Sequence, residues 1–310
     1  MRTFAIELVS WCWWTLIPHA IRTQVFNILN YPAKRRANTA VNKFLADKST
    51  PRTEEEHEVI EFLQRHPCQM IPYSFALDKR QIKVSRDPDS RLHYVIHAGK
   101  RLFFPRTWAP EKIKAYYNGL LNEQHPLSPH RYEADSCVVQ EGDSVVDVGA
   151  SEGLFALDVI ERCQKIYLIE CDRLWSEPLR KTFVAWEEKV VFLEKWISDR
   201  DDSTNNQTTL DSCIMTQEKI GFIKADIEGA EPQLLRGGRR VMDRSDNMRM
   251  AICTYHTQTD ATSIDALSKA AGFQTCFSHG FMVWGSENGI ELRRGVLRAI
   301  KCTSPKLSPL

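Results

Sequence analysis

The sequence predicts an α/β fold, with a mostly parallel sheet that carries helices on both faces. The first observation is a strand, a glycine turn and a helix in succession between residues 144 and 160. The second is that strand patterns then alternate with helical patterns as far as residue 300. Strands that alternate with helices form parallel sheets, because each helix returns the chain to the same end of the sheet. The 310 residues, 43% hydrophobic and 26% charged, suffice for a large core.

Composition narrows the classes of function. Lys and Arg number 41 against 40 Asp and Glu, and the net charge of +1 argues against a whole-protein electrostatic grip on nucleic acid. There is no basic stripe with interleaved aromatics and no Asn/Asp-Pro-Pro-Tyr/Phe block for a flipped base. The nine cysteines include no C-x-x-C, which disfavours a zinc ribbon or a disulfide framework and fits a reducing compartment. We therefore expect a cytoplasmic protein without a nucleic-acid partner.

Residues 1–135 are predicted to form an N-terminal α+β region that caps the domain after it. Residues 1–17 indicate a tryptophan-rich amphipathic helix, too short and too polar to span a bilayer, so no integral membrane segment is expected. Helical patterns follow Thr53 and cover residues 111–121, and residues 81–104 alternate as a small meander does. The polar loop at residues 123–132 either folds over the site or is a rigid linker.

The α/β domain is predicted to cover residues 136–302, with a tail at 303–310. Short apolar runs predict strands at 144–148, 165–170, 190–193, 221–226, 248–254, 273–277, 281–284 and 296–300. Apolar residues at helical spacing predict helices that begin at 154, cover 174–186, end near 237–238 and cover 260–271. The polar segment 198–208 is expected to be a loop. In such sheets ligands bind beyond the carboxyl ends of the strands.

The first of these strands runs into the turn Gly149-Ala150-Ser151-Glu152-Gly153. Gly149 and Gly153 let the backbone approach a ligand that a Cβ would displace. The helix after the turn offers free N–H groups to an anionic group. The dinucleotide fingerprint G-x-G-x-x-G is absent, because Ser151 stands where its second glycine would be, and the phosphate loop ending in Gly-Lys-Ser/Thr is absent too. The turn therefore indicates another class of cofactor.

Groups suited to a nucleoside follow the first three strands. Asp147 closes the first strand, and Glu170 closes the second, where its two oxygens can accept both hydroxyls of a ribose. Trp196 and Ile197 follow the third strand, where an apolar wall for an adenine is expected. The acids together with the glycine turn predict a nucleoside pocket.

Three acids and a histidine follow the next two strands. Asp226, Glu228 and Glu231 either favour the dipole of the next helix or bind a ligand, and a divalent metal is a third use. Because their spacing is not that of a metal site, no metal is predicted. His256 is either structural or a base, since its unperturbed pKa lies near neutrality.

A second pattern fits the same residues. Gly149 to Gly153 also matches G-x-S-x-G, the nucleophile elbow of α/β-hydrolases, and Asp226 and His256 follow Ser151 in the order that those enzymes use. Against it, the parallel pattern begins with this strand, and no His-Gly-Gly-Gly loop lies upstream. A hydrolase using Ser151, Asp226 and His256 is therefore the alternative function.

Beyond these patterns, the chain resembles the FkbM family of S-adenosylmethionine-dependent methyltransferases over roughly residues 138–302. The matching blocks are residues 145–153, 167–170 and 222–231, the last followed by Leu235 and Gly237. Ser128-Pro129-His130 and Cys253-Thr254-Tyr255-His256 are similar to one subgroup. The block Lys-Ala-Asp-Ile-Glu-Gly-Ala-Glu is the most family-specific. Many members have Asn in place of Ser151 and Pro in place of Cys171, and neither change removes a needed charge.

The resemblance implies a Rossmann-like class I methyltransferase fold with a seven-stranded, mostly parallel sheet. It implies S-adenosyl-L-methionine as the cofactor, bound by Asp147, Gly149, Ser151, Gly153, Glu170, Trp196, Ile197 and Asp226. The implied reaction is methylation of a hydroxyl on a sugar, glycan or secondary metabolite, so the expected partner is a small-molecule or glycan acceptor. His256 is the candidate base, with Asp226 or Glu228 orienting it or binding the acceptor. A catalytically inactive methyltransferase-like binding domain is a further alternative, and the oligomeric state is left open.

Overall fold

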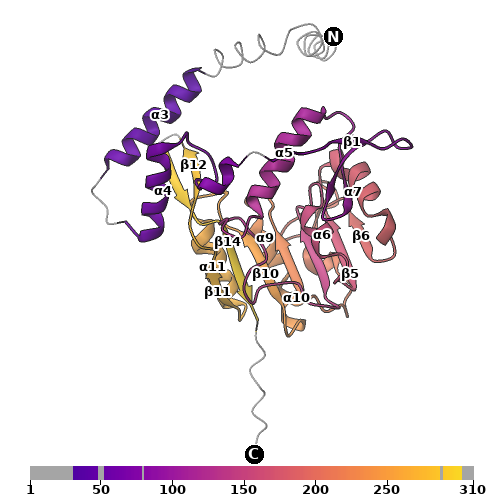
Figure 1. The fold of residues 1–310 in the computed structure, drawn as a ribbon. Coiled ribbons are helices and arrows are strands. Elements are labelled where there is room, and N and C mark those ends of the chain that lie inside the picture. Colours follow the sequence, from indigo (N-terminus) through magenta and orange to yellow (C-terminus); the bar gives the residue numbers. More distant parts are fainter. Residues whose placement is uncertain (1–30, 48–51, 79, 287–288, 302–310) are drawn as a thin grey trace, which may run out of the picture.

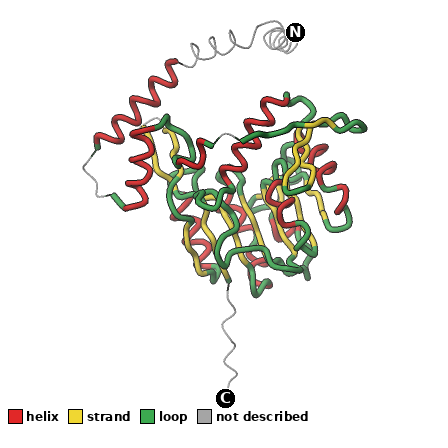
Figure 2. The backbone as a smooth tube through the Cα atoms, in the orientation of Figure 1, coloured by secondary structure: helices red, strands yellow, loops and turns green. Residues whose placement is uncertain are grey.

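The computed structural model describes residues 31–47, 52–78, 80–286 and 289–301. The helix expected at residues 1–17 and the tail at 303–310 lie outside the described residues. A seven-stranded sheet forms the centre of the molecule, with helices packed along it (Figure 1, Figure 2). Among the residues described, none of the helices combines the length and the apolar character needed to span a bilayer.

The central sheet has the strand order β11-β14-β10-β9-β4-β5-β6. Its strands are β4 Ser144–Val148, β5 Lys165–Ile169, β6 Val190–Leu193, β9 Phe222–Ala225, β10 Arg249–Cys253, β11 Gln274–Phe277 and β14 Val296–Ile300. Five neighbouring strands, β6, β5, β4, β9 and β10, are parallel. Strand β14 is antiparallel to both of its neighbours, β10 and β11. This confirms the predicted seven-stranded, mostly parallel sheet. The chain moves away from β4 in both directions, so the ends of β4 and β9 flank the crevice where ligands bind in such sheets.

Helices cover both faces of the sheet because neighbouring strand residues point to opposite sides. Val145 shares a core with Leu157 of α6, whereas Val146 shares another with Leu234 of α9. The helices here are α6 Leu154–Val159, α7 Ser176–Thr182, α8 Leu210–Cys213, α9 Glu231–Gly237, α10 Arg239–Arg244 and α11 Asp260–Ala270. The single helix predicted at 174–186 is instead divided into η2 Arg173–Trp175, α7 and η3 Val184–Trp186.

The N-terminal region contains both the helices and the meander that the sequence predicts. Its elements are α3 Tyr31–Ala46, α4 Glu54–Arg65, η1 Ser74–Leu77, β1 Ser85–Arg86, β2 His93–His97, β3 Lys100–Phe104 and α5 Pro110–Glu123. Helix α4 begins at a capping box, in which Thr53 and Glu56 satisfy each other's backbone N–H groups. Strands β1, β2 and β3 form an antiparallel sheet, although residues 81–84 of the predicted meander at 81–104 belong to none of these strands.

The segment from β2 to α5 packs directly on the central sheet. Phe104 of β3 and Ile113 of α5 are buried in the same core as Val145 of β4. The division at residue 135 therefore separates two stretches of sequence that share one core. This packing places Tyr116 of α5 close to Gly149 and Ser151, which follow β4.

Two expectations for the smaller strands are wrong. Residues 281–284 do not join the central sheet, because β14 already pairs with both β10 and β11. They belong to β12 Met282–Ser286, which pairs with β13 Gly289–Arg293, and Val283 packs against Phe62 of α4. The polar segment 198–208 is not entirely a loop, because β7 Trp196–Ile197 pairs in parallel with β8 Gln207–Thr208.

Candidate active site

The turn after β4 adopts the strained backbone that its glycines permit. Gly149, Ser151 and Gly153 have φ of 73°, 47° and 85°. A Cβ at Gly149 would overlap the backbone carbonyl oxygen of Asp226, so a glycine is needed for the turn to approach the end of β9. Ser151 is held in the left-handed region by its N–H, which donates to Glu170 Oε2 at 2.8 Å.

Two cavities meet at this turn. The β5-side cavity, of ≈ 280 Å³, lies along the ends of β4, β5 and β9, and the α5-side cavity, of ≈ 380 Å³, lies between the turn and α5. The residues that line both are Gly149, Ser151, Asp226 and Glu228. The two cavities are therefore adjacent at these residues.

The β5-side cavity combines an acid with an apolar wall. Glu170 accepts the N–H of Ser151 on one oxygen and the N–H of Asp172 on the other, at 2.8 and 2.7 Å. Each oxygen keeps a lone pair for a further donor. Trp196 and Ile197 line the same cavity. The structure thus brings together most of the residues that the sequence assigns to a nucleoside.

Gly153 has a different role from the other turn residues. It lines neither cavity, and a Cβ there would lie 2.8 Å from the ring of Phe183. Its small size is therefore required by packing of α6 against the segment after α7. A ligand is not what requires glycine at this position.

Beneath the turn, Asp147 and Lys224 form a buried ion pair. Lys224 Nζ lies 3.0 Å from Asp147 Oδ1 and donates to the carbonyl oxygen of Gly149 at 2.6 Å. Burial alone would lower the pKa of Lys224, but the carboxylates of Asp147 and Asp226 raise it above its ordinary value. Neither oxygen of Asp147 receives a well-directed hydrogen bond, and its side chain lines the α5-side cavity. Asp147 can therefore accept hydrogen bonds from a ligand.

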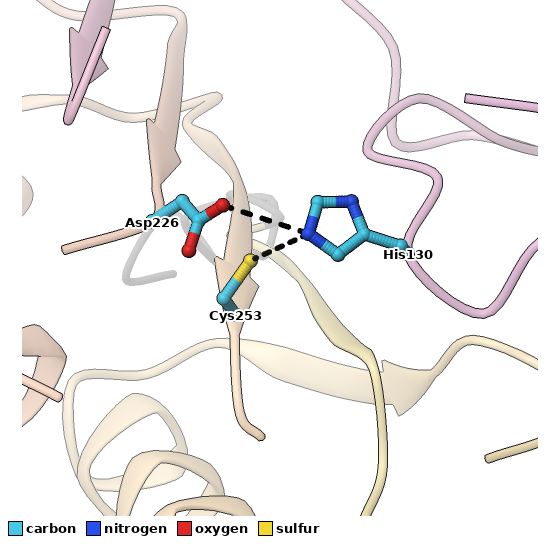
Figure 3. Close-up of side chains that lie close together, drawn as sticks. All are labelled: His130, Asp226 and Cys253. Carbon is cyan, nitrogen blue, oxygen red and sulfur yellow. Dashed lines mark hydrogen bonds and ion pairs between the residues drawn. The ribbon is translucent and has the colours of Figure 1, made fainter. Parts of the chain in front are cut away.

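Asp226 stands at the junction of the two cavities and is surrounded by donors. The hydroxyls of Tyr132 and Tyr255 donate to it at 3.0 and 3.1 Å. The imidazole of His130 points toward Asp226 and Cys253, with Nε2 at 3.5 Å from Oδ2 and 3.9 Å from Sγ (Figure 3). Burial alone would raise the pKa of Asp226, but the imidazoles of His130 and His256 hold it well below its usual range. The carboxylate is thus a fixed negative charge.

His256 lies between two carboxylates. Its Nε2 is 3.2 Å from Asp226 Oδ1, and its Nδ1 is 3.1 Å from Glu231 Oε1. Burial alone would lower its pKa, but Asp226 and Glu231 raise it to about 10. The reason for choosing His256 as the base, a pKa near neutrality, is therefore wrong. Near pH 7 the ring is a cation that stabilises Asp226.

Comparison with known proteins agrees with this geometry. Residues 147–275 match a family model described as the methyltransferase FkbM domain. These residues therefore form an FkbM methyltransferase domain. Among curated proteins, none matches the sequence.

Solved structures similar to this chain include two methyltransferases. One is the methyltransferase FkbM from Methylobacillus flagellatus KT, at 19% identity and a TM-score of 0.43 over 62% of this chain. The match spans only 55% of that chain. The other is a SAM-dependent methyltransferase from Aquifex aeolicus, at 14% identity and a TM-score of 0.39 over 63% of this chain and 99% of that one.

The geometry contradicts the alternative of a hydrolase that uses Ser151, Asp226 and His256. A nucleophilic serine needs one imidazole nitrogen while an acid holds the other. Both nitrogens of His256 face carboxylates, with Asp226 and Glu228 near Nε2 and Glu231 near Nδ1. Ser151 has the left-handed backbone that an elbow requires, but its partner is not available as a base.

The acids after β9 separate into different environments. Glu228 is 91% exposed, whereas Glu231 is fully buried and accepts the N–H of Ile227. Asp226, Glu231 and His256 have ligand atoms close enough to share a metal ion. However, the imidazole uses a different nitrogen toward each acid, so its cationic form already balances them. We therefore interpret this group as an ion-pair network.

The sequence did not indicate several residues of the α5-side cavity, and three of them bear on its chemistry. Tyr116, Tyr132 and Glu152 line it, and the first two come from the region before β4. Glu152 is part of the glycine turn that the sequence predicts, but nothing in the sequence indicates that its side chain is buried. Tyr132 is the last residue of the loop at 123–132, which is predicted either to fold over the site or to act as a rigid linker, and its place in the cavity favours the first interpretation.

We predict that the ring of His256 stays protonated until about pH 10. Its contribution to folding stability is then complete below about pH 6.5 and is lost as the pH rises through about 10. Histidine NMR titration measures this directly. Glu231→Gln should lower the midpoint by about one unit or more, because it removes a buried charge.

Glu228→Gln is the matched control, since its acid also faces His256 but is exposed to solvent. It should change the midpoint much less. A wild-type midpoint near 6.5 would contradict the cationic assignment.

Proposed function

We propose that this FkbM domain transfers a methyl group from S-adenosylmethionine to a hydroxyl of a small acceptor. The observation that carries the proposal is the pair of cavities that share Gly149, Ser151 and Asp226. A two-substrate reaction needs two sites that meet at the reacting atoms. The match to the methyltransferase FkbM domain supports the methyl-transfer part of the proposal.

The β5-side cavity fits the adenosine part of this cofactor. Glu170 retains acceptor capacity for ribose hydroxyls, and Trp196 and Ile197 offer apolar contact to a base. Asp147 fits the amino group, since its buried oxygens lack well-directed donors. Gly149 and Asp226 line both cavities and approach each other closely, so the two cavities adjoin at this point.

The α5-side cavity fits a hydroxylated acceptor. Tyr116, Tyr255 and Trp284 provide aromatic faces, and Glu123 and Glu152 provide acceptor oxygens. Aromatic faces pack on the apolar side of a sugar or ring system, while carboxylates accept its hydroxyl protons. We infer a sugar, glycan or secondary metabolite of this kind, and residues 105–135 then act as a cap over it.

The chain must orient the acceptor and manage its proton. The bound cofactor supplies an electrophilic methyl carbon. Asp226, held by Tyr132, Tyr255 and His256, is a rigid anion at the junction, where it can fix an acceptor hydroxyl in line with that carbon. Its low pKa makes it a weak base, so it serves orientation better than proton removal.

Calorimetric titration with S-adenosylmethionine and S-adenosylhomocysteine tests the proposal. The wild-type protein is expected to bind both with micromolar Kd. Glu170→Gln should weaken binding roughly 10-fold or more, because a hydrogen bond to a charged acceptor contributes about 1.5–3 kcal/mol.

Glu187→Gln, an exposed acid far along the chain from the turn, should bind as wild type does. A folded wild-type protein that binds neither compound would contradict the proposal. Binding without methyl transfer to any acceptor would support the inactive binding domain instead.

A further inference from the structure

Glu152 is a buried acid inside the α5-side cavity. Its side chain is 5% exposed, and it follows the left-handed Ser151 in the glycine turn. Tyr116 donates its hydroxyl to Oε2 at 2.8 Å, and the N–H of Leu154 approaches Oε1 at 3.3 Å. Within the described part of the chain, no Lys, Arg or His forms an ion pair with it. A carboxylate in this setting has few partners and faces the space that an acceptor would fill.

Three ionisable groups that line the cavity with Glu152, namely His256, Asp226 and Lys224, are poorly suited to take a proton. His256 already carries one near neutral pH, and the donors around Asp226 keep that acid ionised. Lys224 is paired with Asp147. A partner of opposite charge fixes the charge of each of these three groups. Glu152 has no such partner among the described residues.

We propose that Glu152 accepts the proton of the acceptor hydroxyl during methyl transfer, an inference that rests on the proposed function. The acceptor oxygen forms a bond to the methyl carbon as the carbon–sulfur bond breaks, and that electron pair stays on sulfur. The O–H bond breaks, and its proton passes to the Glu152 carboxylate. The products are a methyl ether, a neutral thioether and a carboxylic acid, which later releases its proton to water.

The electrostatic surroundings of Glu152 suit this role. Burial raises its pKa to about 7, while the hydrogen bond from Tyr116 and the charge of Lys224 oppose the shift, and Glu123 adds to it. A base whose pKa lies near the working pH is half available and still strong enough to take a proton. These groups come from α5 and β9, which are the elements that face Glu152.

Tyr116 acts here as a positioning residue. Its ring packs edge-on against Trp108, with centroids 5.0 Å apart, and lies 5.9 Å from the ring of Trp175. A ring fixed in this way holds its hydroxyl against Oε2 of Glu152, while Oε1 accepts only the N–H of Leu154 and keeps a lone pair for an acceptor proton. Helix α5 would thus complete the site from the region before β4.

The first test does not need the natural acceptor. Infrared spectra of the free protein should contain a protonated carboxyl band that disappears as the pH rises through about 7. Glu152→Gln should remove this band, and Glu187→Gln should retain it. Tyr116→Phe should move the midpoint upward, because it removes a donor that favours the ionised form. If the band is absent near pH 7 or survives in Glu152→Gln, the proposal is overturned.

The second test measures transfer to methyl glycosides and catechol by formation of S-adenosylhomocysteine. Glu152→Gln should lower kcat by about 10²- to 10⁴-fold, the usual contribution of a general base. The wild-type rate should rise with pH and level off above about 7, and the variant should lack this dependence. A Glu152→Gln rate within threefold of wild type would also overturn the proposal.

Cofactor titration separates the two failures. If wild type does not bind S-adenosylmethionine, the proposed function fails whatever the infrared result is. If both wild type and Glu152→Gln bind it equally and transfer equally, only the role of Glu152 fails. Equal binding with slow transfer is the expected outcome.

Discussion

Gly149→Ala is expected to abolish cofactor binding and to lower the free energy of unfolding by about 2–5 kcal/mol. The new Cβ would overlap the carbonyl oxygen of Asp226 and approach the side chain of Ile227. The φ of 73° adds the cost of a left-handed backbone. Because both neighbours belong to the end of β9, relief of the clash must separate β9 from the turn and disrupt the junction of the cavities. Urea unfolding and calorimetric titration measure the two effects.

Gly142→Ala is the matched control for this variant. Gly142 has nearly the same φ, 79°, but a Cβ there has no heavy atom within 4 Å. It should cost only the backbone strain, about 1–2 kcal/mol, and leave binding intact. Equal losses in the two variants would show that the contact with Asp226 relaxes without consequence, contrary to this account.

Lys224→Met is expected to destabilise the protein by about 3–5 kcal/mol, because it leaves the carboxylate of Asp147 buried without its partner. The variant also removes the hydrogen bond from Lys224 to the carbonyl oxygen of Gly149. Cofactor binding should weaken as the turn loses this support. Urea unfolding at pH 8, where an unpaired buried carboxylate is most costly, gives the largest difference.

Two comparisons make the Lys224 result interpretable. Lys219→Met breaks an ion pair with Asp246 that is 68% and 57% exposed, and it should cost no more than about 1 kcal/mol. Combining Lys224→Met with Asp147→Asn should recover part of the loss, since the stranded charge is then gone. If Lys224→Met lowers the free energy of unfolding no more than Lys219→Met does, the buried ion pair of Lys224 and Asp147 does not support the turn.

Local sequence determined the parts of this protein that depend on neighbours along the chain. The five residues of β4 are all buried, as a parallel strand covered on both faces requires, and the glycines after them allow the turn. Thr53 and Glu56 form the capping box that begins α4. The acids that close β4 and β5 also lie where the alternating pattern places them, because parallel strands end at the same edge of a sheet.

The packing of the folded chain, in contrast, determines which of these residues can accept a proton. His256 became a cation because Asp226 and Glu231 approach both of its nitrogens, and Glu152 became a candidate base because α5 buries it beside Tyr116. Such contacts join residues far apart in the sequence, and the pKa of a group follows from its burial and from the charges nearby. The sequence by itself determined the strand, the turn and the order of the acids, whereas the folded chain determined their protonation and therefore their roles.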